Sequence, residues 1–128
     1  MTVELNHTII WSSDRFASAA FFTEMYGLPE AVDLFHFRVV KLANGVSLDF
    51  ADRDGEIAPQ HYAMLVSDAE FDATMERIRE RDVKFWADPA RQQPGEINRR
   101  DGGKGVYFEG PDGHFYEALT VPYGGSGK

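Results

Sequence analysis

Two histidines and one glutamate in this sequence are of the residue types that bind divalent metals, and they stand at related places along the chain. His7 opens the apolar run NHTIIW, His61 opens the run QHYAMLV, and Glu117 lies within GPDGHFYEAL. Neutral imidazoles combined with a carboxylate suit a first-row divalent ion and leave positions open for water or substrate. We therefore expect His7, His61 and Glu117 to bind one divalent metal ion, with Fe, Mn, Ni, Co and Zn as the candidates.

The surroundings of Glu117 favour a ligand over a surface acid. The segment is typical of two strands joined at Gly-Pro-Asp-Gly, and side chains alternate between the two faces of a strand. Glu117 therefore shares a face with Phe115 and Leu119, where an unpaired carboxylate is costly. Each histidine alone would be more simply interpreted as a packing or rim residue. The related placement of both histidines, together with Glu117, favours the metal site.

Asp49 is a fourth candidate. It lies five residues after the turn residue Asn44 in NGVSLDF. Glu117 likewise lies five residues after Asp112 in DGHFYEA. The sequence leaves three interpretations of Asp49 open: a fourth ligand, a hydrogen-bonding partner of a ligating histidine, or no role at the site.

The same order of features occurs twice, which divides the chain into two similar halves. In NHTIIWSSDRF and in QHYAMLVSDAEF, a histidine opens an apolar run that ends in Ser-Asp, seven residues further on. In each half an acid then follows late, on a segment that comes after a turn dipeptide. Such internal repetition predicts two copies of one supersecondary unit.

The first half is predicted to begin with a strand at 3–12, whose residues are apolar, aromatic and β-branched. The sequence SSD at 12–14 offers an N-cap for a helix with apolar residues at helical spacing, and Gly27 fits its C-terminal end. Asn44-Gly45 is a strong hairpin signal. Three short strands are predicted after the helix, at 31–37, 38–43 and 46–51.

The second half is predicted to repeat this plan. A strand at 61–66 leads to a helix capped by Ser67 or Asp68. A short strand at 83–86 precedes a long loop at 88–104, which is either a lid or a solvent-exposed insertion. The two strands around Gly-Pro-Asp-Gly complete this half.

The expected fold class is α+β, with two βαβββ modules, at 1–52 and 60–122, forming a curved mixed sheet with a metal-binding cleft. Residues 53–59 are expected to link the modules and 123–128 to form a flexible tail, all within a single domain of 128 residues. Because the helix of each half must cover one sheet face, the four candidate ligands are expected together on the other face, at the floor of the cleft.

Composition excludes several functions. The chain has no cysteine, which rules out disulfides, thiolate ligands and a cysteine nucleophile, and its net charge is -8. This acidic balance argues against nucleic acid and anionic membranes as partners. No apolar run approaches the roughly 20 residues of a membrane span, and the N-terminal residues lack the pattern of a signal peptide. We therefore expect a cytoplasmic protein.

The double βαβββ plan, with His7 in NHTIIW, His61 in QHYAMLV and Glu117 in GPDGHFYE, resembles the vicinal oxygen chelate superfamily. This superfamily includes glyoxalase I, extradiol dioxygenases, thiol transferases that inactivate fosfomycin, and metal-free bleomycin-binding proteins. The resemblance implies a metal held by these three residues and chelation of two neighbouring oxygens of a small-molecule substrate. It also implies a homodimer, often with each site built from both chains.

Departures from the family patterns bear on the expected activity. Where extradiol enzymes carry a histidine, this chain reads INRRDGGKG. Asp49 matches the acidic ligand that glyoxalase I carries in its first half, but it is one methylene shorter than the usual Glu. The thiol transferases resemble residues 60–117 in particular, and their arginine beyond the final strand is missing from VPYGGSGK.

The expected function is that of a metal-dependent enzyme, either a dioxygenase or a lyase or isomerase, acting on a small substrate with adjacent oxygens. Apolar walls around the metal favour a hydrophobic or aromatic substrate, and Tyr107 is a candidate donor. The residues expected to contact substrate are Ile9, Trp11, Ala63, Leu65, Tyr107 and Phe115. The alternatives are a metal-free, bleomycin-resistance-like protein that sequesters a small ligand and a thiol transferase that resembles fosfomycin resistance proteins.

Overall fold

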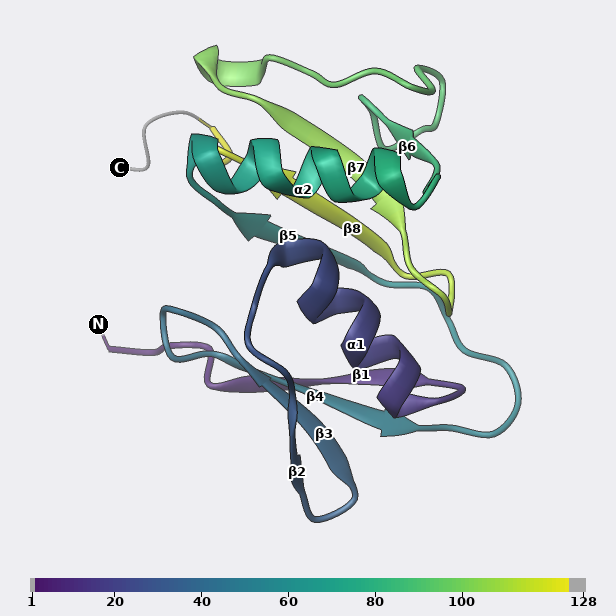
Figure 1. The fold of residues 1–128 in the computed structure, drawn as a ribbon. Helices are drawn as coiled ribbons and strands as arrows, with labels where there is room; N and C mark the ends of the chain where they lie inside the picture. The colour runs from purple at the N-terminus through teal and green to yellow at the C-terminus, as the bar shows by residue number, and fades with distance from the viewer. Residues whose placement is uncertain (1, 125–128) are drawn as a thin grey trace.

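The computed structural model describes residues 2–124, which form two modules of similar build (Figure 1). The first consists of β1 (His7–Ser12), α1 (Arg15–Tyr26), β2 (Val32–Leu34), β3 (Phe37–Lys41) and β4 (Ser47–Asp52). The second consists of β5 (His61–Leu65), α2 (Asp68–Glu80), β6 (Phe85–Trp86), a 3-10 turn (Arg100–Gly102), β7 (Gly105–Glu109) and β8 (Phe115–Leu119). The predicted α+β class with two βαβββ modules is confirmed.

Each module forms its own four-stranded mixed sheet. The strand order is β1-β4-β3-β2 in the first module and β5-β8-β7-β6 in the second. In both sheets the first and last strands of the module are parallel neighbours, and the other pairs are antiparallel. The mixed sheet expected from the sequence is therefore built as two separate halves.

The strand register confirms the repeat that the sequence indicated. In the first sheet, Asp49 pairs with Ile9, two residues after His7. In the second sheet, Glu117 pairs with Ala63, two residues after His61. Each histidine and its acid therefore lie on adjacent strands, on the same face, at equivalent places of the two modules.

Both helices begin at the Ser-Asp motifs. Asp14 caps α1 by accepting hydrogen bonds from the backbone N–H groups of Phe16 and Ala17. Ser67 caps α2 in a reciprocal capping box with Glu70. These caps fix where each helix begins after the first strand of its module.

The hydrophobic core lies between the helices and one face of each sheet. Ile10 is fully buried on that face, whereas its neighbour Ile9, which points the other way, is 38% exposed. A single buried cluster runs through both modules. Its largest aromatic members are Phe22, Phe50, Phe71, Phe108 and Tyr116. Neither α1 nor α2 packs on the opposite faces; we call them open face A (sheet β1-β4-β3-β2) and open face B (sheet β5-β8-β7-β6).

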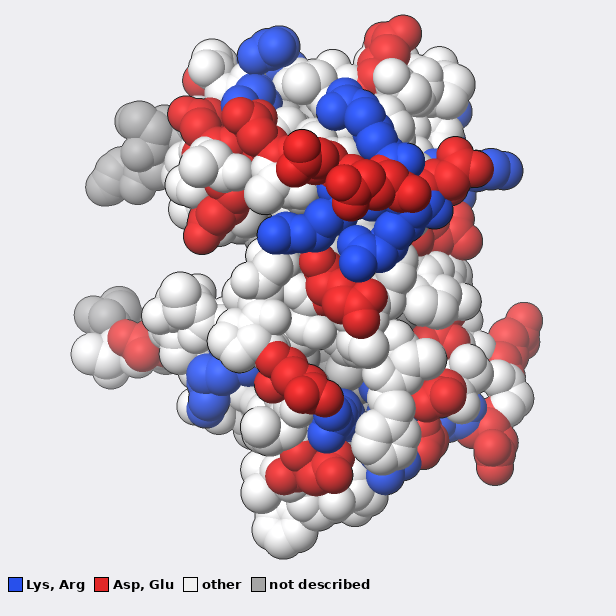
Figure 2. Space-filling view, viewed as in Figure 1, with Lys and Arg blue, Asp and Glu red and all other residues white. Residues whose placement is uncertain are grey.

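The outer surface of α2 is charged. Figure 2 shows acidic and basic side chains gathered over this helix, which is typical of a solvated face. In the part of the chain that the structure describes, no helix is long and apolar enough to cross a membrane.

Several strands are shorter than the sequence predicted. The first strand spans 7–12 rather than 3–12, because its register with β4 begins at His7. The strands predicted at 31–37 and 38–43 are shortened to 32–34 and 37–41, since Phe35 takes a positive φ of 56° and the chain turns there. The strand predicted at 83–86 is reduced to two residues. Of the predicted tail at 123–128, residues 125–128 lie outside the described residues.

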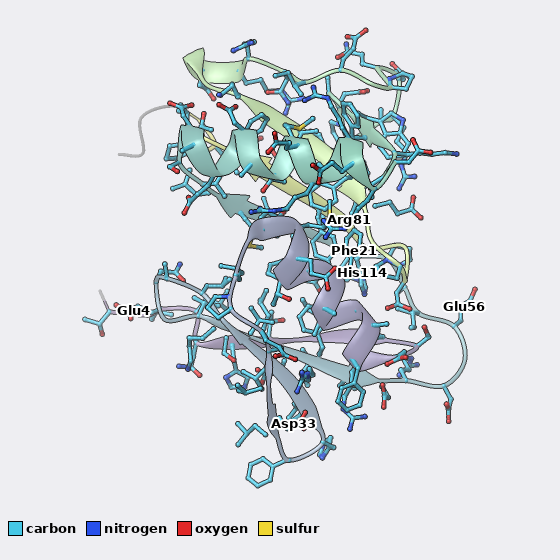
Figure 3. All side chains as sticks on the ribbon, viewed as in Figure 1. Glu4, Phe21, Asp33, Glu56, Arg81 and His114 are labelled. Atoms are coloured by element: carbon cyan, nitrogen blue, oxygen red, sulfur yellow. The ribbon has the colours of Figure 1, made fainter. Side chains whose placement is uncertain are left out.

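Side chains of the Gly-Pro-Asp-Gly turn and of the residue after it join the second module to the first. Asp112 Oδ1 accepts hydrogen bonds from the backbone N–H (3.0 Å) and the hydroxyl (2.8 Å) of Ser13. The buried His114 accepts from the Gln60 N–H at Nδ1 (3.0 Å), and its Nε2 donates to the Trp11 carbonyl (2.8 Å). We call these contacts the inter-module clasp; Figure 3 labels His114 between the two modules.

Candidate metal centre

Open face B brings one histidine and one carboxylate into direct contact. His61 Nε2 lies 3.0 Å from Glu117 Oε1, and His61 Nδ1 lies 2.9 Å from the backbone carbonyl of Phe115. Glu117 is only 8% exposed, although it is on the uncovered face of the sheet. The pair is a consequence of the parallel β5–β8 register, which sets His61 diagonally across from Glu117.

The tautomer of His61 follows from its contact with the Phe115 carbonyl. A carbonyl oxygen can only accept, so Nδ1 carries a proton and donates it to Phe115. In the neutral ring, Nε2 then presents its lone pair to the Glu117 carboxylate, and two electron-rich atoms face each other at 3.0 Å. A cation shared by the two atoms, either a proton or a metal ion, removes this repulsion.

The residues present fit a divalent metal. Nitrogen and oxygen ligands bind such ions at about 2.0–2.2 Å, so two atoms 3.0 Å apart can bind the same ion. Metal-binding histidines also commonly donate their second ring N–H to a carbonyl, as His61 does to Phe115. His61 and Glu117 would therefore provide two of the ligands.

Open face A carries the equivalent pair. His7 Nδ1 lies 2.7 Å from the Asn6 side-chain oxygen, which accepts its proton and leaves Nε2 with a free lone pair. Asp49 accepts a hydrogen bond from the Ser47 hydroxyl at 2.7 Å. His7 is exposed, whereas Asp49 is half-buried. His7 thus has the ligand-ready tautomer of His61, and Asp49 already has a neutral partner.

The chain does not bring all the predicted ligands together. Among residues 2–124, no three side chains of His, Asp, Glu or Cys are grouped closely enough to hold a metal ion. His61 and Glu117 form one half-site on open face B, and His7 and Asp49 lie on open face A. The candidate ligands are therefore divided between the two modules, as one histidine–acid pair on each open face.

The predicted substrate-contacting residues divide between the same two faces. Ile9 and Trp11, 38% and 41% exposed, lie on open face A in the same alternation as His7. Ala63, Leu65, Tyr107 and Phe115 lie on open face B with the His61–Glu117 pair. Leu65 is 61% exposed.

Tyr107 is the residue of β7 that pairs with Glu117. Its ring stacks with those of His61 and Phe115, at centroid distances of 5.7 and 5.5 Å. Burial raises the pKa of the Tyr107 phenol, and the nearby Glu117 carboxylate also raises it, while the hydrogen bond from Arg100 opposes the change. Tyr107 therefore stays protonated beside the pair at neutral pH.

Two arginines from the loop after β6 also lie on open face B, and sequence reasoning did not place them there. Arg100 Nη1 donates to the Tyr107 hydroxyl at 2.8 Å. The Arg91 guanidinium lies 4.4 Å above the Phe115 ring and forms an ion pair with Glu109 at 2.6 Å. The signal in the sequence was the small basic cluster of Arg99, Arg100 and Lys104, which could supply cations for a phosphonate but did not indicate a place on this face.

The third member of that cluster has a different role. Lys104 forms ion pairs with Asp72 (2.8 Å) and Asp68 (3.6 Å) of α2. It therefore ties the loop to the helix on the covered side of the sheet, and it is not a cation of open face B.

Taken together, the fold and the half-sites define a class: α+β proteins of two βαβββ modules, each with a histidine on its first strand and an acid on its last. The chain belongs to the Glyoxalase/Bleomycin resistance protein/Dioxygenase superfamily, whose sequence profile matches residues 4–118. Members of this family typically use divalent metals, act on small molecules and commonly form dimers.

Individual relatives differ in activity. The chain is 30% identical over 126 residues to the metallothiol transferase FosB of Lysinibacillus sphaericus (strain C3-41), spanning 94% of this chain and 84% of that protein. It is similar to the solved structure of oxidase ChaP-H1, with 54% identity, a TM-score of 0.95 and coverage of 97% of this chain and 100% of that chain. Oxidase ChaP-H2 gives 52% identity, a TM-score of 0.95 and coverage of 99% and 100%. The family thus includes both oxidases and metallothiol transferases.

Proposed function

We propose that this protein is a metal-dependent dioxygenase, which uses O2 as the oxidant and acts on a small aromatic substrate with two adjacent oxygen atoms. The observation that carries the proposal is the His61–Glu117 pair, in which a lone-pair nitrogen faces a nearly buried carboxylate at 3.0 Å. Sequence identity of 54% and 52% to two oxidases along essentially the whole chain favours oxidation over thiol transfer.

The third ligand in this proposal is His7 of a second copy of the chain. Each of the two histidines lies on an edge strand, β1 or β5, where a partner can approach. In a two-fold symmetric dimer, open face A of each copy can meet open face B of the other, which forms two equivalent sites. The exposed apolar side chains Ile9, Trp11 and Leu65 support such a contact.

The chain's own residues have distinct tasks in the proposed reaction. A bound divalent ion supplies a Lewis acid for the two substrate oxygens. The Phe115 carbonyl orients the His61 ring, so that Nε2 is the binding nitrogen. Tyr107 keeps its phenol proton, which can hydrogen-bond to the Glu117 carboxylate and so help to orient that ligand. Apolar and aromatic side chains of both open faces exclude water, which strengthens these polar interactions.

The proposal is tested by metal binding in single variants and in a mixture. We expect the wild-type protein to bind about one divalent ion per chain, and His7→Ala, His61→Ala and Glu117→Ala each to lose tight binding while remaining folded. Random subunit exchange between His7→Ala and Glu117→Ala makes half of the dimers mixed, each with one intact site, so about a quarter of the wild-type metal should return.

Two results would contradict parts of this proposal. A mixture that recovers no metal, although exchange has occurred, contradicts a site shared between chains. Less than about 0.2 ion per wild-type chain after titration with Fe, Mn, Ni, Co or Zn contradicts the enzyme and favours a metal-free binding protein.

A thiol transferase is the second candidate, because of the 30% identity to FosB. Metal-dependent consumption of fosfomycin together with a low-molecular-weight thiol would favour it. The pairing of Lys104 with the acids of α2 removes one cation that a phosphonate would use.

A further inference from the structure

The C-terminal end of α1 places a phenol directly behind the candidate metal pair. Tyr26, the last residue of this helix, donates its hydroxyl proton to the backbone carbonyl of Glu117 at 2.7 Å, and the contact is buried. The carboxylate of Glu117 points to open face B, whereas Tyr26 belongs to the core on the covered side of the same sheet. A side chain of the first module therefore touches the backbone of the strand that carries the candidate ligand of the second.

The Tyr26 phenol is held in place from two sides. Its ring contacts those of Phe22 and Phe108, at centroid distances of 4.7 and 5.7 Å. The backbone just before it is also held, because the Met25 carbonyl accepts a hydrogen bond from the Thr74 hydroxyl of α2 at 2.9 Å. Figure 1 shows this end of α1 next to α2. The hydroxyl is thus presented to β8 by a part of the core in which both ring and backbone are packed.

The backbone of β8 determines the geometry of the metal pair in two ways. It carries Glu117 itself, and its Phe115 carbonyl accepts the Nδ1 proton of His61 at 2.9 Å. A shift of β8 relative to β5 would therefore change the His61–Glu117 distance and the orientation of the His61 ring together. It follows that a hydrogen bond which holds β8 at Glu117 acts on both candidate ligands.

This support is absent from the equivalent place in the other module. Asp49 has the position in the first sheet that Glu117 has in the second. Among residues 2–124, the Asp49 carbonyl accepts no side-chain hydrogen bond. The helix α2 ends in the exposed Glu80, where α1 ends in Tyr26. Because the two modules share their strand plan, the contact behind Glu117 is not a consequence of the repeated fold.

We propose that Tyr26 is a positioning residue of the metal pair: its hydroxyl holds the β8 backbone at Glu117, so that Glu117 and His61 can bind the same divalent ion. This inference rests on the proposed metal-dependent function and adds to it a residue of the other module that lies outside the site. Loss of such an outer partner commonly weakens metal binding about 10- to 100-fold.

The first test is metal binding by Tyr26→Phe, which keeps the ring and removes only the hydroxyl. We expect the dissociation constant of Zn²⁺ to rise at least about tenfold, measured by competition with a chromophoric chelator on folded protein. The matched control is Tyr116→Phe, on β8 itself. The Tyr116 ring is also buried, but its hydroxyl makes no hydrogen bond within residues 2–124. Loss of that hydroxyl should leave the dissociation constant essentially unchanged.

The second test uses metal-free protein. Nitrogen NMR spectroscopy reports which ring nitrogen of His61 carries the proton in the neutral ring, and the Phe115 carbonyl holds this proton on Nδ1. If Tyr26 positions β8, Tyr26→Phe should raise the share of the Nε2–H tautomer at least about twofold, and Tyr116→Phe should not. A loss of overall stability alone would leave this share as it is, provided that the variant remains folded.

Unchanged values of both readouts in Tyr26→Phe overturn the positioning role and leave Tyr26 as a core residue with a satisfied hydroxyl. If Tyr26→Phe does not fold, the same readouts in Thr74→Val decide. That variant removes the hydrogen bond that holds the end of α1, and it should move both readouts in the same direction by a smaller factor. A wild type that binds no metal contradicts the proposed function, and the His61 tautomer in metal-free Tyr26→Phe then still decides the role of Tyr26.

Discussion

At the residue scale, the chemistry of the candidate centre depends on which nitrogen of each histidine carries the proton. In His61 and in His7 the Nδ1 proton is engaged, by the Phe115 carbonyl and by the Asn6 side chain respectively. Both rings therefore offer Nε2 as the ligand atom. The two acids are less alike, because Glu117 faces a ring nitrogen whereas Asp49 accepts from Ser47. This difference supports Glu117 as a ligand and gives Asp49 a partner without any metal.

Buried phenols should make the protein less stable at alkaline pH. Burial is the largest cause that raises the pKa of each of four tyrosines, Tyr26, Tyr62, Tyr107 and Tyr116. The pKa of a phenol is about 10 in the unfolded chain. When folding raises that pKa, the stabilisation is complete below about pH 10 and is lost as the pH rises from there towards the pKa of the folded state. We expect the free energy of unfolding to be lower at pH 10.5 than at pH 8, as measured by urea denaturation.

A spectroscopic titration checks the same prediction. Most of the tyrosinate absorbance at 295 nm should appear together with the loss of the near-UV circular dichroism signal. Tyr62→Phe should reduce the loss of stability, while replacement of the exposed Tyr123 by Phe should not. Full ionisation near pH 10 with the tertiary signal retained would contradict burial of these phenols.

At the element scale, the Gly-Pro-Asp-Gly turn does more than reverse the chain between β7 and β8. Through the inter-module clasp, Asp112 and His114 hold the end of β1, and His114 also holds the backbone next to His61. The clasp therefore holds β1, which carries His7, next to the start of β5, which carries His61. Its buried histidine has both ring nitrogens occupied, which explains why a polar side chain is tolerated there.

Removal of His114 should therefore destabilise the fold. His114→Ala leaves the Gln60 N–H and the Trp11 carbonyl without their partner, and an unmade buried hydrogen bond costs about 1–3 kcal/mol. We expect the free energy of unfolding in urea to fall by about 2–4 kcal/mol. The matched control, His36→Ala, alters an exposed histidine and should change it by less than about 0.5 kcal/mol. Equal effects of the two variants would mean that the clasp adds no stability.

The sequence predicted local arrangements well because they depend on neighbours in the chain. Strand alternation, the Ser-Asp caps and the repeated spacing were enough to predict the two modules and the shared face of His61 and Glu117. The separation of His7 from that pair depends on how the two sheets pack through a common core, and no local pattern encodes this. The placement of Arg100 depends on loop contacts through Asn98, which have no periodic signal.

At the scale of the whole molecule, one chain leaves much apolar surface uncovered. Ile9 and Trp11 on open face A and Leu65 on open face B are all substantially exposed. Both open faces carry half of a candidate metal centre, and both first strands lie at sheet edges. An apolar surface that carries an incomplete set of candidate ligands is typical of a site completed by a second copy.

We therefore expect a homodimer of about 29 kDa by light scattering, twice the 14.4 kDa of the chain. Leu65→Asp places a charge on open face B while keeping both His61 and Glu117, and burial of that charge in a dimer interface is unfavourable. This variant should sediment as a monomer and lose tight metal binding together, since each copy then keeps only its own half-sites. Glu76→Lys, on the exposed surface of α2, is the matched control and should leave both the dimer and the metal intact. A monomeric wild type at micromolar concentration, or a monomeric Leu65→Asp that still binds metal tightly, would contradict the shared centre, because a single chain supplies only two of its three ligands in one place.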